Sequence, residues 1–181
     1  NLPLFAHQYP WLWLDPKSVK TLGFDPFENS RRATLRDMRL SEKDPLLAPF
    51  GVMGLSASDG PHGYRAFRFG DGEKDSGDHD GTVCPGCFAA SMMFAPETVL
   101  THLDQLRRSP IQHKILGRYG FVDAFNPSTQ WFDTDSLGIT VGSVYLSSAN
   151  LGEHTVWTSF KEIPAIQDGL AVANRFPSVK K

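Results

Sequence analysis

Asp123 is the residue of this chain best suited to acid/base chemistry. It lies in the segment YGFVDAFNP, where the residues beside it are apolar. Such neighbours favour burial, and burial disfavours a charged carboxylate unless hydrogen bonds compensate. A carboxyl group in these surroundings is a reasonable acid/base candidate. The structural alternative is that Asp123 binds backbone amides or an arginine and holds a loop in place.

Asp59 is the second candidate. It lies in GLSASDGPHGY, where Gly60 and Pro61 force a turn and place the carboxylate at a loop tip. The alternative is that Asp59 only caps or braces that turn. Motifs for other chemistry are absent from the sequence, which contains no GxSxG nucleophile elbow and no GxxxxGK phosphate loop.

Both acids belong to polar blocks that are rich in acids and aromatics. The four blocks read FENSRRATL, GLSASDGPHGY, DGTVCPG and YGFVDAFNP. Because each polar group needs a partner once it leaves water, such blocks are hard to bury. Four of them in one chain indicate loops that converge on a cleft. Acids beside aromatic rings are also what a sugar-handling site needs.

Two further groups of residues could support such a site. Glu28, Arg31 and Arg32 form a compact polar cluster in which an arginine could orient a carboxylate bidentately. A helix terminus that faces solvent would have the same sequence. The segment 7–9 (HQY), with the tryptophans that follow it, could line a sugar subsite or form a buried aromatic strip.

Cys84 and Cys87 form a CPGC pair, which is compatible with a redox dithiol or with half of a zinc site. No second CxxC or HxxxH segment accompanies the pair, and no βαβ pattern surrounds it. The sequence therefore favours a structural role. We expect two small buried side chains at the start of a helix, since a free cysteine packs as a small hydrophobe.

The acidic run DGEKDSGDHDG (71–81) invites a calcium interpretation. It fails the helix–loop–helix template, because its glycine is misplaced and no glutamate closes the loop. A solvated loop is the favoured interpretation, with calcium as the alternative. We therefore predict no metal site and no cofactor.

The bulk composition is that of a soluble globular protein, with 40% hydrophobic and 21% charged residues in a chain of 181. The net charge of −2 gives no reason to expect nucleic acid, and no Lys/Arg cluster indicates a membrane surface. No apolar run approaches the length of a membrane span. The first residues look like the middle of a protein, so we expect a fragment or a processed chain.

Helical patterns alternate with unusually long loops, so the predicted fold class is mainly α. We expect helices over 30–42, 88–93, 96–108, 141–151, 154–161 and 163–174, with short strands around 64–69. Residues 51–82 and 109–135 are expected to be loops. The expected cap of the first helix is Asn29 or Ser30. The apolar side of the helix 96–108 is expected at Val99, Leu100, Leu103 and Leu106.

In this order, the blocks resemble the C-terminal half of the glucoamylase-like (glycoamylase) family, which includes the family 144 endo-β-1,2-glucanases. The resemblance covers residues 4–165 and rests on HQYPWLWLD, FENSRRATL, GLSASDGPHGY, FAPE, YGFVDAFNP and LGI. It implies part, about half, of an (α/α)6 toroid with long active-site loops and few short strands. Residues 1–181 would be the C-terminal portion of that domain, and the N-terminal half would be missing.

The resemblance also implies inverting hydrolysis of β-linked glucans, above all β-1,2-glucan. In such a reaction one carboxylic acid protonates the leaving oxygen and one carboxylate activates water. The general acid would be a glutamate of the missing half, and the base would be Asp123, with Asp59 second. The residues that contact substrate or support the site would be Gln8, Glu28, Arg31, Tyr64 and Trp131.

The implied partners are an oligosaccharide or polysaccharide substrate and either the missing N-terminal half or a second copy. The family analogy implies a periplasmic or secreted location. A non-catalytic glycan-binding or scaffold domain that keeps the toroid loops is the alternative. The chain also departs from the family pattern: where relatives carry an acid–Gln pair after LGI it has Thr140 and Val141, and where they carry a glutamate it has Ala149. These departures bear on the expected substrate more than on the expected fold.

Overall fold

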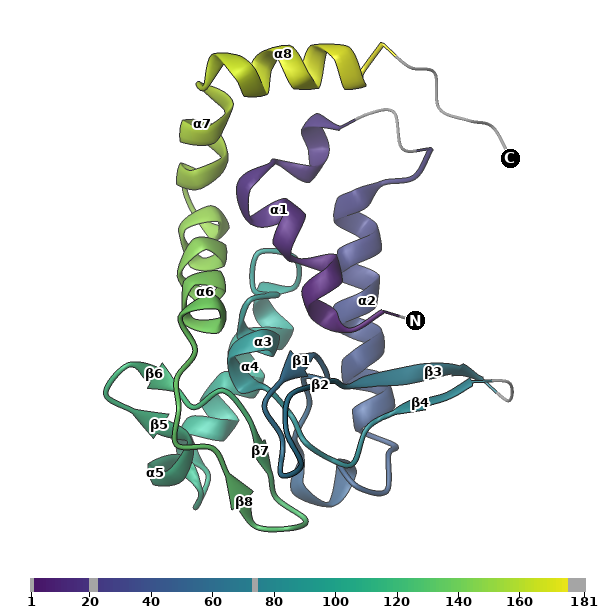
Figure 1. The fold of residues 1–181 in the computed structure, drawn as a ribbon, viewed down its shortest axis with the longest axis vertical. Helices are drawn as coiled ribbons and strands as arrows, with labels where there is room; N and C mark the ends of the chain where they lie inside the picture. The colour runs from purple at the N-terminus through teal and green to yellow at the C-terminus, as the bar shows by residue number, and fades with distance from the viewer. Residues whose placement is uncertain (1, 20–22, 73–74, 176–181) are drawn as a thin grey trace.

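The computed structural model describes residues 2–19, 23–72 and 75–175, and its architecture is mainly helical (Figure 1). The α-helices are α1 (Tyr9–Trp13), α2 (Pro26–Ser41), α3 (Pro85–Ala89), α4 (Pro96–Arg108), α5 (Gln112–Ile115), α6 (Gly138–Leu151), α7 (Thr155–Lys161) and α8 (Pro164–Ala173). The strands form short antiparallel hairpins: β1 (Ala57–Ser58) with β2 (Arg65–Ala66), β3 (Arg68–Gly72) with β4 (Asp75–Asp78), β5 (Leu116–Gly117) with β6 (Gly120–Phe121), and β7 (Phe125–Asn126) with β8 (Trp131–Phe132). Short 3-10 helices lie at Leu4–His7 (η1), Pro16–Ser18 (η2) and Ala48–Phe50 (η3).

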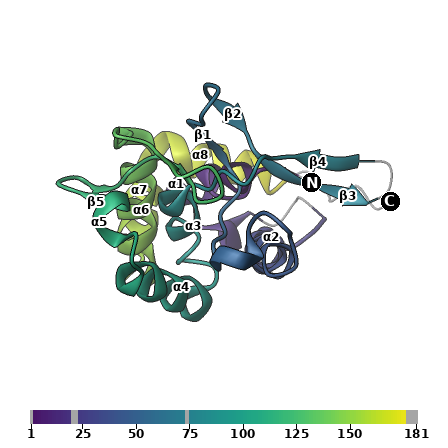
Figure 2. The ribbon, with the colours of Figure 1, turned by 90° about the horizontal axis from the view of Figure 1, so that it is seen from below.

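The hairpins gather at one end of the long helices α2 and α6 (Figure 1). Seen from below, α3 lies between α2 and α6, with α4 alongside (Figure 2), and α3 contacts both α6 and α4. Every residue from 81 to 95 is buried. The loops at this end therefore rest on a floor built around α3.

The predicted helices are present, but several begin or end elsewhere. α4 has the predicted bounds. α2 begins at Pro26, a turn earlier than predicted, because the Asp25 side chain caps it by accepting the backbone N–H of Glu28 at 3.0 Å. Proline suits the first helical turn, where its missing N–H costs nothing. The expectation of a cap at Asn29 or Ser30 is therefore wrong.

The middle of the chain also differs from the expectation. α3 begins three residues earlier than predicted and ends at Ala89, and residues 91–94 form turns. The segment 51–82, expected as loop with short strands, contains the β1–β2 and β3–β4 hairpins. The segment 109–135, expected as loop, contains α5 and the β5–β6 and β7–β8 hairpins. Residues 176–181 lie outside the described residues.

The buried faces of the two long helices are polar. On α2 the buried residues after the first turn are Ser30, Thr34, Asp37 and Ser41, and on α6 they are Thr140, Ser143, Ser147 and Asn150. Both sets repeat every three or four residues, so each set forms one stripe along its helix. Short side chains let neighbouring backbone approach closely, and their buried polar groups then need hydrogen-bond partners.

On α2 the partner is the backbone that leads into the β1–β2 hairpin. The Asp37 carboxylate accepts the N–H of Gly54 at 2.9 Å and the N–H of Leu55 at 3.2 Å. Gly54 has a φ of +110°, and a Cβ there would lie 2.8 Å from the Cys84 carbonyl oxygen. A residue without a side chain is therefore required where α2, this strand and α3 meet.

On α6 the partners are the segment after α3 and the neighbouring helices. The Ser147 hydroxyl accepts the N–H of Met93 at 3.1 Å. The Asn150 amide donates to the Leu12 carbonyl of α1 at 2.9 Å and accepts the N–H of Trp157 in α7 at 3.1 Å. One stripe of polar side chains thus fixes α1, α7 and the floor against α6.

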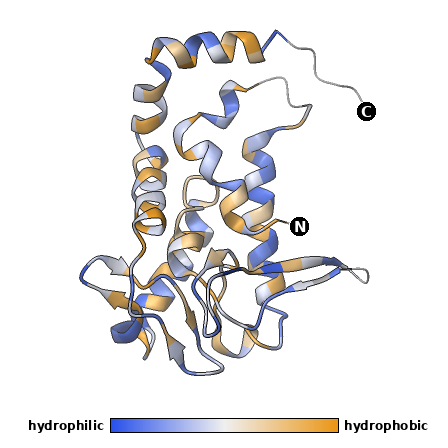
Figure 3. Cartoon of the chain, viewed as in Figure 1, coloured by the Kyte–Doolittle hydropathy of each residue, from blue (hydrophilic) through white to orange (hydrophobic). Residues whose placement is uncertain are grey.

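The helices α6 and α8 contain many hydrophobic residues (Figure 3), and several of their large hydrophobic side chains are exposed. Tyr145 is 72% exposed and Ile139 59% exposed on α6, and Val172 is 51% exposed on α8, which buries none of its residues. Among the described residues, no helix combines the length and apolar character needed to cross a bilayer. These side chains form surface that a further protein segment could cover.

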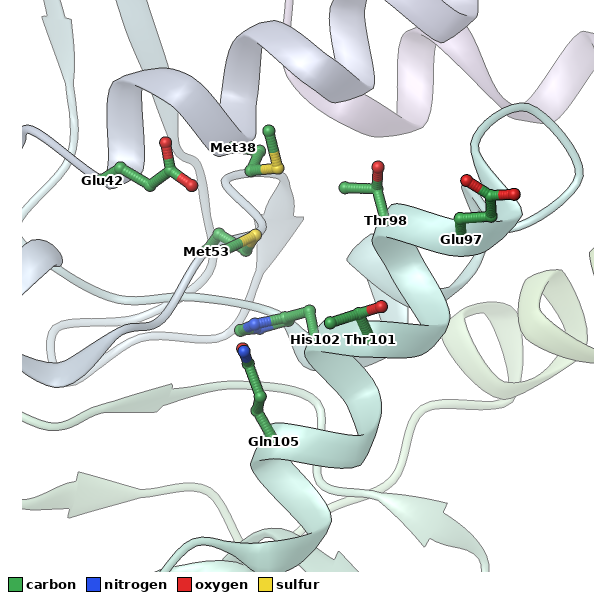
Figure 4. Close-up of a pocket in the computed structure, with 8 residues that line it drawn as sticks. All are labelled: Met38, Glu42, Met53, Glu97, Thr98, Thr101, His102 and Gln105. Atoms are coloured by element: carbon green, nitrogen blue, oxygen red, sulfur yellow. The ribbon is translucent and has the colours of Figure 1, made fainter.

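A cavity of about 300 Å³ lies between α2 and α4, beside Met53 of the segment that leads into β1 (Figure 4). His102 of α4 lines it and is 2% exposed, whereas Leu100, expected on the apolar side of this helix, is 48% exposed. The imidazole packs edge-on against Phe88, and Gln105 lies beside it. Burial lowers the pKa of His102 to about 4.

The lowered pKa of His102 predicts a specific loss of stability in acid. The unfolded chain takes up a proton on this residue near pH 6.5, while the folded protein does so only near pH 4. The stability that neutral His102 contributes is therefore complete above pH 6.5 and falls as the pH drops towards 4, by about 3 kcal/mol in total. Chemical denaturation should show this slope in the wild type and a flatter one in His102→Gln. His113→Gln, which changes an exposed histidine, should keep the wild-type slope; identical slopes in all three proteins would contradict the prediction.

Candidate active site

The structure brings the two predicted acids together. Asp59 lies in the loop between β1 and β2, and Asp123 lies between β6 and β7. The backbone N–H of Asp59 donates to Asp123 Oδ2 at 2.9 Å, and the Thr140 hydroxyl donates to Asp123 Oδ1 at 2.7 Å. Asp123 is 1% exposed. Its carboxylate is therefore held from both sides, by the β1–β2 loop and by the first turn of α6.

A third acid, Asp133, completes this cluster. One carboxylate oxygen from each of Asp59, Asp123 and Asp133 lies within 4.8 Å of the other two. Asp133 directly follows β8, and its Oδ1 accepts the backbone N–H groups of Thr134 and Asp135 at 2.7 and 3.2 Å. We call Asp59, Asp123 and Asp133 the acid cluster. Among the described residues it is the one set of three acidic, histidine or cysteine side chains close enough to hold a metal ion.

The acid cluster changes the ionisation of Asp59. Burial raises the pKa of this carboxyl above its ordinary value, and the charges of Asp133, Asp123 and Asp135 raise it further, as does a hydrogen bond with the Asp133 side chain. Each of these effects disfavours the charged form. Asp59 therefore retains a proton at a higher pH than an ordinary aspartate does.

Two tyrosines lie beside the acids. Tyr64, at the far end of the β1–β2 loop, is 61% exposed. Partial burial and the charges of Asp123 and Asp59 raise its pKa. Burial likewise raises the pKa of Tyr9 in α1, which bonds Ser143 and is influenced by Tyr64 and Asp123. Both phenols are thus protonated hydrogen-bond donors close to the acid cluster.

The structure places Gln8 in the core. It is 1% exposed, and its amide nitrogen donates to the Cys87 carbonyl at 2.8 Å and to the Ser91 hydroxyl at 2.6 Å. This side chain holds the start of α1 against α3 and presents no open surface to a substrate. Of the two roles expected for Gln8, substrate contact or support of the site, its burial and its hydrogen bonds favour support.

Glu28 and Arg31 lie on the first turns of α2 and bind each other. Glu28 accepts from the Nε atoms of Arg31 and Arg32, both at 2.7 Å, and hydrogen bonds from Arg31 and Arg32 lower its pKa to about 2. Within the described residues these side chains form ion pairs with one another and not with Asp59 or Asp123. The arrangement is that of a solvent-facing helix terminus, which was the alternative interpretation of this sequence.

Trp131 is half-buried in β8 and pairs with Asn126 of β7. Its neighbour Phe132 stacks on Phe125 in the core. Because side chains alternate along a strand, Trp131 lies on the opposite side of this hairpin from Phe132, the side on which Asp133 continues. The predicted aromatic residue is therefore carried by the same hairpin as the third acid.

Asp133 is the functional candidate that the sequence interpretation misses. It lies in WFDTDS, outside the four polar blocks. It comes close to Asp123 only because β8 pairs with β7. The backbone N–H of Asp133 donates to the Ala124 carbonyl at 3.1 Å, and the N–H of Asp123 donates to the Asp135 carbonyl at 2.8 Å. An acid directly after a pair of aromatic strand residues was the available signal.

The CPGC segment is buried at the start of α3, as predicted, with Cys84 as its N-cap. The expectation of free thiols is wrong, because Cys84 and Cys87 are joined by a disulfide. Between them, Gly86 packs against α6: a Cβ at this position would lie 2.5 Å from Thr140 Cγ2. The segment thus supports the threonine that binds Asp123.

The acidic run 71–81 does not form a calcium loop in the described residues. It lies largely in the β3–β4 hairpin, where Asp75 pairs with Arg68 at 2.7 Å and Asp78 pairs with Arg65. Glu73, which contributed to the calcium alternative, lies outside the described residues. Arginines therefore neutralise acids that a metal would otherwise need.

Because Gly86 packs on Thr140, we predict that adding one methyl group at this position lowers the free energy of unfolding. Gly86→Ala should lower the free energy of unfolding by about 1–3 kcal/mol, because the stiff Thr140 side chain must shift. Gly142→Ala, in the interior of α6 with no atom within 4 Å of the new Cβ, should instead raise it by up to about 1 kcal/mol. Chemical denaturation of the two variants measures both changes, and equal effects would contradict the proposed contact.

Comparison with known proteins gives a consistent result. Over residues 1–164 the chain matches the model of the Glycoamylase family. It is 28% identical over 171 residues to an exo-β-1,2-glucooligosaccharide sophorohydrolase (non-reducing end) of Parabacteroides distasonis, covering 93% of this chain and 23% of that protein. The chain therefore spans about a quarter of that relative's length.

Solved structures show the same fold. An endo-β-1,2-glucanase from Chitinophaga pinensis, solved with sophorotriose and glucose, superposes with a TM-score of 0.80 at 28% identity, covering 94% of this chain and 40% of that one. A β-1,2-glucanase from Parabacteroides distasonis gives 0.84 at 23% identity, with 97% and 25% covered. This likeness and the mainly helical architecture with few short strands fit part of an α/α toroid. Because the family model matches nearly the whole described chain, the protein belongs to the Glycoamylase family.

Proposed function

We propose that this chain is the C-terminal portion of a glycoside hydrolase domain that cleaves β-linked glucans, above all β-1,2-glucan, with inversion. The observation that carries the proposal is the geometry of Asp123. Its buried carboxylate is held by the Thr140 hydroxyl and the Asp59 N–H, beside exposed Tyr64. Two hydrogen bonds orient this carboxylate, as activation of water requires. The similarity to β-1,2-glucan hydrolases supplies the substrate class.

The general acid lies outside the acid cluster in this proposal. Inverting glycosidases hold acid and base roughly 6.5–9.5 Å apart, to leave room for the attacking water. Carboxylate oxygens of Asp59 and Asp123 lie within 4.8 Å of each other, which is too close. The two acids therefore belong to the base side of the reaction. The relatives are two and a half to four times longer than the matched region, and the opposing acid would lie in such an additional segment.

Tyr64 and Trp131 are the proposed substrate contacts. Tyr64 combines an exposed ring with a protonated hydroxyl near two acids. Trp131 lies on the hairpin that carries Asp133. An aromatic ring stacks on the apolar face of a sugar while polar neighbours bind its hydroxyl groups, which is the usual division of labour in a ligand site. Glu28 and Arg31 would act, if at all, through the orientation of α2.

The proposed partner is the remaining part of the toroid. A cavity of about 350 Å³ between α6 and the β5–β6 hairpin is lined by apolar and aromatic side chains, including exposed Tyr119 and Tyr145. Exposed apolar patches mark surfaces that bind another protein element. The greater length of the relatives argues for a preceding segment of the same polypeptide over a second copy.

A non-catalytic glycan-binding domain is the second candidate. The family resemblance favours it, because the chain has Thr140 and Val141 where that resemblance leads us to expect an acid–Gln pair. Loss of those groups would leave a cleft that binds sugar without cleaving it. Glucan binding that survives Asp123→Asn, with no cleavage by the parent protein, would support this candidate.

Cleavage of glucans tests the proposed function. The full-length protein should release reducing sugar from β-1,2-glucan in preference to β-1,3- and β-1,4-glucan, and the first product should have the inverted anomeric configuration. Asp123→Asn should abolish release, because its amide cannot accept a proton from water. A folded full-length protein without activity on any of the three glucans would defeat the hydrolase proposal.

The Thr140 hydroxyl is testable with a matched pair of variants. Thr140→Val keeps the shape but removes the donor to Asp123, so kcat/KM should fall about tenfold or more. Thr140→Ser keeps the hydroxyl and should retain most of the activity. If valine and serine give equal rates, the hydrogen bond has no role in the reaction.

The partner proposal is tested by light scattering of residues 1–181 expressed alone. Uncovered apolar surface should make this piece self-associate. Addition of the preceding segment of the full-length protein should convert it into a defined one-to-one complex. A stable, monodisperse 20.1 kDa monomer that does not bind the added segment would contradict the proposal.

A further inference from the structure

One oxygen of the acid cluster has no conventional hydrogen-bond partner. Asp133 Oδ1 accepts two backbone N–H groups, but Asp133 Oδ2 is buried and accepts none. A buried carboxylate oxygen without a donor is costly. The side chain within hydrogen-bonding reach is that of Asp59, itself a carboxyl group. This contact is favourable only if one of the two acids carries a proton.

The charges of the cluster point to the same conclusion. Three carboxylates whose oxygens lie within 4.8 Å of one another cannot all remain charged without strong repulsion. Asp123 accepts from Thr140 and from the Asp59 N–H, so negative charge is stabilised there. Asp133 Oδ1 likewise accepts two N–H groups. No backbone or hydroxyl donor to the Asp59 carboxylate is recorded among the described residues, which makes Asp59 the acid that best accommodates a proton.

We propose that Asp59 and Asp133 share one proton, with Asp59 donating to the orphan Oδ2 of Asp133, and that Asp133 is thereby a positioning residue for the reaction. This inference rests on the proposed function. The shared proton reduces the charge of the cluster from three to two. It also takes Asp59 out of competition as the base, because a protonated carboxyl cannot accept a proton from water.

Other ionisable groups face this pair from every neighbouring element. Asp123 lies between β6 and β7, Asp135 precedes α6, Tyr64 ends the β1–β2 loop and Tyr9 belongs to α1. These four are acids or phenols, and only acids contribute charges that shift the pKa of Asp59. The nearest basic side chains along the chain are exposed: His62 belongs to the β1–β2 loop, and Lys114 of α5 lies over the Phe132 ring at 4.6 Å. The surroundings therefore favour retention of the proton.

The variant Asp133→Asn, whose side chain has nearly the same shape as aspartate, tests the shared proton. In Asp133→Asn the Oδ1 atom can keep its two backbone bonds, and the new amide nitrogen takes the place of the orphan Oδ2. This nitrogen donates permanently to Asp59, which no longer needs the shared proton. The matched control is Asp135→Asn, which removes a nearby charge from an exposed side chain and leaves the pair intact.

Carbon-13 NMR of labelled aspartate carboxyls in the full-length protein measures the proton directly, with the Asp59 signal assigned by its loss in Asp59→Asn. Asp133→Asn should lower the titration midpoint of Asp59 by about one pH unit or more, a tenfold change in proton affinity. Asp135→Asn should lower it by clearly less. Equal midpoints in the wild type and Asp133→Asn, or equal shifts in the two variants, would overturn the proposal.

The reaction provides a second, separate readout. With loss of the shared proton the wild type should lose kcat/KM at alkaline pH, whereas Asp133→Asn has no such proton to lose. In Asp133→Asn the fall of kcat/KM at alkaline pH should therefore occur at a higher pH than in the wild type. If it occurs at the same pH, Asp133 has only a structural role. If the protein cleaves no glucan but the NMR midpoints shift as expected, the proposed function fails and the shared proton stands. If it cleaves glucan and the midpoints do not shift, only the shared proton fails.

Discussion

Hydrogen bonds from a few buried polar side chains of α2 and α6 to neighbouring backbone fix the elements on which the candidate site rests. Asp37 of α2 binds the strand that enters the β1–β2 hairpin, and Ser147 and Asn150 of α6 bind the floor and the flanking helices. Each bond contributes modestly, but loss of either partner leaves a buried polar group unpaired. The stripe on α6 begins with Thr140, whose hydroxyl binds Asp123. The same device that packs the helices therefore also orients the candidate base.

The helices were largely predictable from sequence, because proline placement and apolar periodicity are local signals. α4 shows this most clearly, with proline at its first position and apolar residues spaced along one side. Helix boundaries that depend on a single capping residue were harder to predict. The N-cap of α2 is Asp25, which lies one turn before the cap expected from the sequence. Burial was hardest to predict for polar side chains. The Gln8 amide, for example, finds its hydrogen-bond partner only when α3 lies beside α1.

The acids of the site show the same limit. Asp59 and Asp123 could be singled out because their local surroundings, a turn and an apolar segment, are visible in the sequence. Their mutual contact could not, since it depends on where two hairpins end. Asp133 carries no local mark of its own and enters the site only through β7–β8 pairing. The disulfide of the CPGC segment was similarly ambiguous, because the same spacing serves thiols, metals and disulfides.

The contact between Asp59 and Asp123 joins residues 64 positions apart in the chain. Contacts over such separations form late in folding, after the cost of closing a long loop has been met. While the chain is still assembling, its acids remain apart in water and repel one another little. Their repulsion is thus confined to the last stage of folding, when the helices already hold the hairpins in place. It should act mainly on how fast the finished loops reopen, and hardly at all on how fast the helical frame forms.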